Sequence, residues 1–72
     1  MSDIVFKDRV GNKLYKKVIP SRNLIQYYAR DRDGKILNYS RASRIVKKSG
    51  IIKKSTIVSI NKGNRYSIYR RW

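Results

Sequence analysis

Few side chains in this sequence of 72 residues could take part in catalysis. It contains no histidine and no cysteine, and its acids are four aspartates. The usual general bases, thiol nucleophiles and zinc ligands are therefore missing. Asp31 and Asp33 are close in sequence, but Asp-x-Asp-Gly between two predicted strands is typical of a turn whose side chains bond the local backbone. We expect no enzymatic activity, no cofactor and no metal site.

The second chemical feature is charge of one sign. The chain has 19 Lys and Arg residues against four acids, a formal net charge of +15. Residues 1–34 hold eight basic residues and all four acids, whereas residues 35–72 hold eleven basic residues and no acid. Solubility is normally achieved with mixed signs. This bias indicates a polyanionic partner, for which nucleic acid is the most available candidate, and it places the expected binding face in the second half.

The first half of the chain, which helps to position the charged residues, is predicted to form β-strands. Alternation at residues 3–7, a tight turn at Gly11-Asn12 and a returning stretch at residues 14–19 predict a β-hairpin. Pro20 then interrupts the strand pattern. Residues 24–30 are rich in β-branched and aromatic types, and with a turn at 31–34 and a return at 35–39 they predict a second hairpin.

From Ser40 onward the hydrophobic period changes from two to about 3.6. A short amphipathic helix is predicted over residues 40–49, with Ser40 as its N-cap. Its inner stripe is Ala42, Ile45, Val46 and Ser49, and its outer residues are Arg41, Arg44, Lys47 and Lys48. Gly50 is the expected left-handed stop. The first helix is therefore short and presents basic residues outward.

A second helix is predicted over residues 53–61, because Thr56, Ile57 and Ile60 fall on one inner stripe at helical spacing. Residues 65–72 return to a period of two and predict a closing strand. Together the elements predict one α+β domain with two β-hairpins, a two-helix helix-turn-helix unit and a C-terminal strand. Within the single domain at 1–72, the hairpin region covers 1–39, the helix-turn-helix 40–63 and the closing strand 64–72.

The predicted helix pair is typical of a helix-turn-helix, whose second helix enters the major groove of DNA. Serine hydroxyls on that helix can meet base edges, and a valine can meet a thymine methyl group. The expected base contacts are Lys54, Ser55, Val58 and Ser59. The expected phosphate contacts are Arg41, Arg44, Lys47, Lys48, Lys53, Lys62, Arg65, Arg70 and Arg71. The alternative is a helix pair that only packs together, with its charges solvated.

The second half also resembles a known module. Its motifs, in order, are Asp-Gly-Lys at 33–35, a serine before the first helix, Gly-Ile at 50–51, Ser-Thr-Ile at 55–57 and Asn-Lys-Gly at 61–63, before an aromatic end. Over residues 33–72 this order is similar to the helix-turn-helix repeat of intron-encoded homing endonucleases and related phage proteins. The resemblance implies a freestanding DNA-binding module without a nuclease centre.

The aromatic residues support a different kind of binding. Six tyrosines, one phenylalanine and one tryptophan interleave with basic residues, most densely at 66–72. Such a composition also suits single-stranded RNA or DNA, whose bases stack on exposed rings. Alternation points Tyr66 and Trp72 inward. It points Tyr69 outward, together with one residue of the pair at 27–28, so core packing accounts for most of the rings.

We therefore expect a small DNA-binding protein that reads duplex DNA, as a transcriptional regulator or accessory factor of a phage, virus or mobile element. The alternatives are binding of RNA or single-stranded nucleic acid through a basic, aromatic sheet, and inhibition of a host protein. The apolar runs are too short to cross a bilayer and no signal peptide is evident. The expected location is the cytoplasm or the host nucleoid or nucleus, without secretion. The sequence leaves open whether the chain forms a homodimer.

Overall fold

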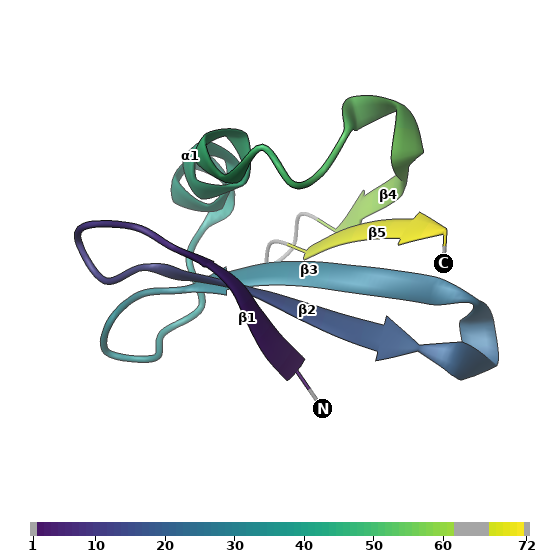
Figure 1. Cartoon of the computed structure of the whole chain (residues 1–72), viewed down its shortest axis with the longest axis horizontal. Coiled ribbons are helices and arrows are strands. Elements are labelled where there is room, and N and C mark those ends of the chain that lie inside the picture. Colours follow the sequence, from purple (N-terminus) through teal and green to yellow (C-terminus); the bar gives the residue numbers. More distant parts are fainter. Residues whose placement is uncertain (1, 62–66, 72) are drawn as a thin grey trace.

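The computed structural model describes residues 2–61 and 67–71. In these residues five antiparallel strands form one sheet in the order β1-β2-β3-β5-β4, and one α-helix lies across a face of the sheet (Figure 1). The elements are β1 (Ser2–Lys7), β2 (Lys13–Ile19), η1 (Pro20–Arg22), β3 (Leu24–Arg30), α1 (Tyr39–Ser49), η2 (Lys54–Thr56), β4 (Ile57–Asn61) and β5 (Ser67–Arg71), where η denotes one turn of 3-10 helix. None of the described helices is both long and apolar enough to span a membrane.

Strands β1, β2 and β3 form a meander joined by short turns. The hairpin of β1 and β2 confirms the first predicted hairpin. Its loop is closed by Asp8, whose Oδ1 accepts hydrogen bonds from the backbone N–H groups of residues 10–12 at 2.8–3.0 Å. Between β2 and β3, Pro20 opens η1, and Asn23 ends it with a φ of 52°. Asparagine tolerates this left-handed conformation better than most residues do.

The second predicted hairpin is wrong, although its turn is correct. The Oδ1 of Asp31 accepts two backbone hydrogen bonds, both of 2.9 Å, and so shapes the turn that follows β3. Residues 35–39 form no strand. Ile36 makes one isolated bridge with Arg30, and the chain then enters α1. The second hairpin would have paired residues 35–39 with β3. In the structure, β5 pairs with β3 instead.

Helix α1 corresponds to the first predicted helix, but its N-cap lies two residues earlier than predicted. Its N-cap is Asn38, not Ser40, since the Oδ1 of Asn38 accepts a hydrogen bond of 3.0 Å from a backbone N–H of the first turn. The helix ends at Gly50, which has a φ of 63° as expected for a left-handed stop. Of the predicted inner stripe, Ala42 and Ile45 are buried, whereas Val46 and Ser49 are half-buried.

The second predicted helix is wrong, and with it the helix-turn-helix unit. Over residues 53–61 the chain forms η2 and then the edge strand β4. The register of β4 against β5 shifts between Ile57 and Ser59, so Ile57 and Ile60 both lie on the α1 side although they are three residues apart. A bulged strand thus reproduces the i, i+3 spacing of a helix. Its β-branched residues favour the strand.

The hydrophobic core lies between α1 and the sheet. It consists of Leu14, Ile25, Tyr27, Ala29, Leu37, Ala42, Ile45 and Ile68. The described part of β5 confirms the closing strand, because Ile68 is buried whereas Tyr69 and Arg71 point to the other side of the sheet. The inward positions predicted for Tyr66 and Trp72 lie outside the described residues.

Candidate nucleic-acid interface

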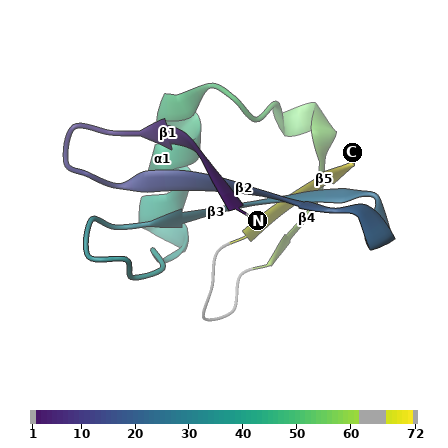
Figure 2. The ribbon, with the colours of Figure 1, turned by 60° about the horizontal axis from the view of Figure 1, so that its bottom comes forward.

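The two faces of the sheet differ in what covers them. Helix α1 and the segment leading to β4 lie on one side, and in the described residues no helix covers the other side (Figure 2). We call this second side the open face. Directly paired residues of an antiparallel sheet project to the same face, so the strand register gives the rows of side chains on it.

Three cations form one row of the open face, at the end near the β1–β2 loop. Lys7 pairs with Lys13, and Lys13 pairs with Arg30. Like charges directly opposite one another destabilise a sheet. An anion bound along this row would remove the repulsion.

The four acids lie away from the open face. Asp3 is on the α1 side of β1, while Asp8, Asp31 and Asp33 are in turns. Burial raises the pKa of the Asp8 carboxyl, but hydrogen bonds from the Asn12 side chain and from nearby backbone N–H groups outweigh it and hold that pKa below its ordinary value. The carboxylates of Asp8 and Asp31 therefore serve their own turns rather than neutralising the row of cations.

Tyrosines occupy the middle of the open face. Tyr15 and Tyr28 are directly paired, and their rings stack with centroids 5.2 Å apart and planes 9° apart. The guanidinium carbon of Arg30 lies 5.6 Å from the centroid of the Tyr28 ring, and its Nη1 donates a 2.8 Å hydrogen bond to the Gly34 carbonyl. Tyr69 adds a third ring from β5. All three tyrosines are half-buried, so part of each is accessible.

Further cations stand on the other side of these rings. Lys17 and Tyr69 both pair with Gln26, and the Gln26 amide donates a 3.1 Å hydrogen bond to the Ser67 hydroxyl. Arg71 is exposed one row beyond. The stacked pair of Tyr15 and Tyr28 therefore lies between two groups of cations, and Tyr69 shares a row with Lys17.

The residues predicted to read bases do not share a helical face. Lys54 and Ser55 lie in η2, whereas Val58 and Ser59 lie in β4, and all four are exposed. Ser59 pairs with Tyr69 and thus lies at the margin of the open face. The other three do not reach the tyrosine rows through any described strand pairing.

The predicted phosphate contacts are divided between the two sides of the sheet. Exposed cations of α1 and of the segment after it, on the α1 side, are Arg41, Arg44, Lys47, Lys48 and Lys53. Arg70 is also on that side, with its guanidinium carbon 5.5 Å from the Tyr27 ring centroid. Its buried Nε has no hydrogen-bond partner among the described residues. Arg71 belongs to the open face. Lys62 and Arg65 lie outside the described residues.

The cations contributed by β1, β2 and β3 are not among the contacts predicted from the sequence. Lys7, Lys13, Lys17 and Arg30 come from the half of the chain that we expected to be less important. One signal was present, because the period of two places Lys13, Tyr15 and Lys17 on one side of a strand. Their alignment with Arg30 depends on the register between strands.

Comparison of the chain with protein-family models, curated proteins and solved structures gave no match. The recognition helix implied by the resemblance to the homing-endonuclease module is replaced by η2 and β4 over residues 53–61. The open face itself is therefore the candidate site.

Proposed function

We propose that the protein binds single-stranded nucleic acid on its open face. The observation that carries this proposal is the in-register row of Lys7, Lys13 and Arg30 directly beside the stacked pair of Tyr15 and Tyr28. Phosphates along the row would relieve the repulsion between the cations. Bases would then stack on the accessible parts of the rings.

The arrangement suits an unpaired strand better than a duplex. Bases of a duplex already stack on one another and present their edges in the grooves. The major groove, about 12 Å wide, admits an α-helix or a two-stranded ribbon. The cations of the open face span β1, β2, β3 and β5, a width of roughly 14 Å before side chains are added. Flexible single strands can instead follow the face and turn their bases toward it.

Charge supports the proposal through its effect on affinity and salt dependence. The net charge of +15 attracts any polyanion, and the open face would supply the contacts that form in the complex. If four cations each neutralise one phosphate, the logarithm of the binding constant should fall with the logarithm of salt concentration with a slope of about −2.8.

Fluorescence anisotropy can test the proposal with labelled DNA and RNA strands of about 12 nucleotides and a duplex of the same length. Titrations at about 50 and 200 mM salt give the slope. We expect both single strands to bind more tightly than the duplex at each salt concentration. Tighter binding of the duplex would contradict the proposal.

A matched pair of variants locates the binding face. Lys13→Gln with Lys17→Gln removes two charges from the open face, and Arg44→Gln with Lys48→Gln removes two charges from α1. The first variant should lose more affinity and reduce the magnitude of the salt slope by about 1.4. Equal losses in the two variants would show attraction by net charge rather than binding on the open face.

A further inference from the structure

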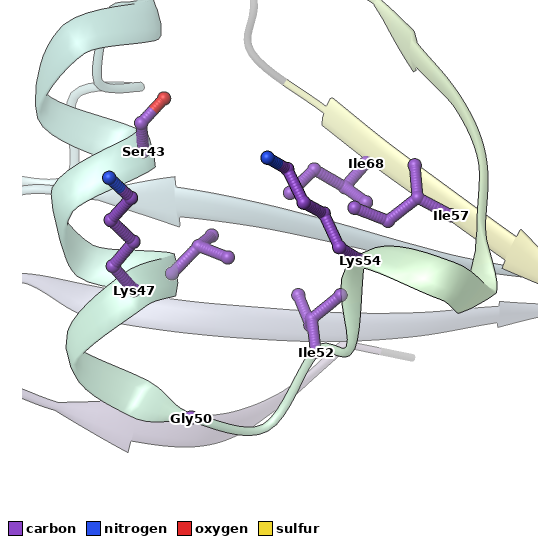
Figure 3. Close-up of a pocket in the computed structure, with 8 residues that line it drawn as sticks. Ser43, Lys47, Gly50, Ile52, Lys54, Ile57 and Ile68 are labelled. Atoms are coloured by element: carbon purple, nitrogen blue, oxygen red, sulfur yellow. The ribbon is translucent and has the colours of Figure 1, made fainter.

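An apolar hollow lies on the α1 side of the sheet, away from the open face. It is formed between α1 and the segment that runs through η2 into β4, and its volume is about 360 Å³ (Figure 3). A water molecule occupies roughly 30 Å³ in the liquid. The hollow is therefore large enough to take a bulky side chain.

The walls of the hollow are aliphatic. They include Val46 from α1, Ile52 from the following segment, Ile57 from β4 and Ile68 from β5. Ile68 is buried, and the other three are partly buried residues packed against the core. An apolar group placed here would release water from these side chains and extend the core outward.

Two lysines stand beside this aliphatic surface. Lys47 on α1 and Lys54 in η2 extend from opposite sides of the hollow, and their nitrogen atoms lie toward the same end of it (Figure 3). Both lysines are exposed, and none of the described residues that line the hollow carries a carboxylate. The Ser43 hydroxyl donates a 2.7 Å hydrogen bond to the Tyr39 carbonyl, which leaves its lone pairs for an incoming donor. The electrostatic complement of this rim is anionic.

We propose that the hollow binds an apolar side chain of an acidic peptide segment in a partner protein. The aliphatic walls take the side chain, and carboxylates beside it in the segment pair with Lys47 and Lys54. An apolar centre inside a charged rim is the usual anatomy of a protein interface. The site does not suit a nucleobase, because none of the described residues that line it has an aromatic ring for stacking, and its aliphatic groups would leave the base edge without hydrogen-bond partners. This site is separate from the proposed nucleic-acid site.

A short synthetic peptide tests the proposal on the whole protein. The probe is an acetylated, amidated peptide with one leucine flanked on both sides by glutamates. Its binding is monitored through the methyl signals of Val46, Ile52, Ile57 and Ile68 in NMR spectra of the protein. We expect saturable shifts of these signals. The same peptide with alanine in place of leucine should bind about tenfold more weakly or worse, because it lacks the buried methyl groups. Equal binding of the two peptides would overturn the proposal.

Two charge variants separate specific pairing from general attraction. Lys47→Glu with Lys54→Glu reverses the rim charges, whereas Lys48→Glu with Lys53→Glu makes the same change of net charge at neighbouring residues that do not line the hollow. We expect the first pair to weaken peptide binding about tenfold more than the second. Equal weakening would overturn the proposal, as would peptide shifts confined to the open face.

A further variant tests the hollow without changing the net charge. Ser43→Leu should fill part of the hollow and weaken peptide binding, while the anisotropy of labelled oligonucleotides with the same variant stays unchanged. Unaltered peptide binding by this folded variant would overturn the proposal. Saturation of the same methyl signals by dodecanoate but not by the peptide would assign the hollow to a lipid and also overturn it. Oligonucleotide binding is measured separately, so failure of either site leaves the other proposal intact.

Discussion

Tyr15 and Tyr28 stack across β2 and β3 with their ring centroids 5.2 Å apart and their planes 9° apart. Each ring restricts the other, so the aromatic part of the open face is arranged before any ligand arrives. Preorganisation of this kind lowers the ordering cost of binding. The pair should therefore contribute both to folding and to the proposed nucleic-acid site.

A double-mutant cycle on this pair measures its contribution to folding. Tyr15→Leu, Tyr28→Leu and the double variant should give a coupling energy of about 0.5–1.5 kcal/mol in urea unfolding, since stacked rings stabilise beyond their buried area. A cycle between Tyr15 and Tyr69, which lies two strands from β2, should be additive. Additive losses for Tyr15 and Tyr28 would show that the rings do not interact in solution.

The row of cations should make the free protein less stable than it could be. We expect Lys13→Gln to raise the free energy of unfolding by about 0.2–1 kcal/mol at low salt, because Lys13 lies between Lys7 and Arg30. The gain should shrink at high salt, where the repulsion is screened. Lys16→Gln, on the α1 side of the same strand, should give no gain. Urea unfolding at two salt concentrations measures both, and a loss of stability in Lys13→Gln would contradict the repulsion.

Two apolar residues should differ sharply in their importance for folding. Leu14 has no exposed surface, so Leu14→Ala should cost about 2–5 kcal/mol. Ile60 is 37% exposed on the edge strand, so Ile60→Ala should cost about 1 kcal/mol or less. Thermal or urea unfolding gives both values. A loss at Ile60 as large as that at Leu14 would favour the helix predicted over residues 53–61 and contradict the edge strand β4.

The start of α1 can be checked at two polar residues. Asn38→Ala should cost about 1 kcal/mol of unfolding free energy, because it removes the oxygen that accepts the first-turn hydrogen bond. Ser40→Ala should stay within about 0.5 kcal/mol, since Ser40 is exposed inside the first turn. The reverse order would identify Ser40 as the cap.

Asp8 should make stability depend on pH. Its carboxyl has a lowered pKa in the folded protein, so the ionised form stabilises the fold. This contribution is present above the ordinary aspartate pKa of about 4 and is lost as the pH falls through the lowered folded value. The stability advantage of the wild type over Asp8→Asn should therefore shrink in acid. Asn12→Ala, which removes a donor to this carboxylate, should weaken the same pH dependence. Parallel pH profiles for wild type and Asp8→Asn would contradict the prediction.

The fold could be predicted from the sequence where its signals are local. The first hairpin, the helix ending at Gly50 and the alternation of Ile68 with Tyr69 all follow from short-range patterns. The second helix could not be rejected, because the bulge at the start of β4 gives Ile57 and Ile60 helical spacing. The strand predicted at 35–39 is wrong for another reason, because the second partner of β3 is β5, which lies far along the chain.

The candidate site was less predictable than the fold. Alternation within β2 indicated that Lys13, Tyr15 and Lys17 share a side, but no local pattern states which face of a sheet a helix will cover. That depends on the packing of α1 against the residues around Leu14 and Ala29. The open face therefore became evident only when the strand register and the position of α1 were known together.

The position of β5 beside β3 also has a consequence for the order of assembly. The side chains of Gln26 and Ser67 are hydrogen-bonded although 41 residues separate them in sequence. Closing so long a loop carries an entropic cost that the short η1 connection between β2 and β3 avoids. The β1-β2-β3 meander can thus form early, while Ile68 is still absent from the core. Until residues 67–71 arrive, one edge of an aromatic strand is available to other chains, so folding competes with intermolecular strand pairing at that step.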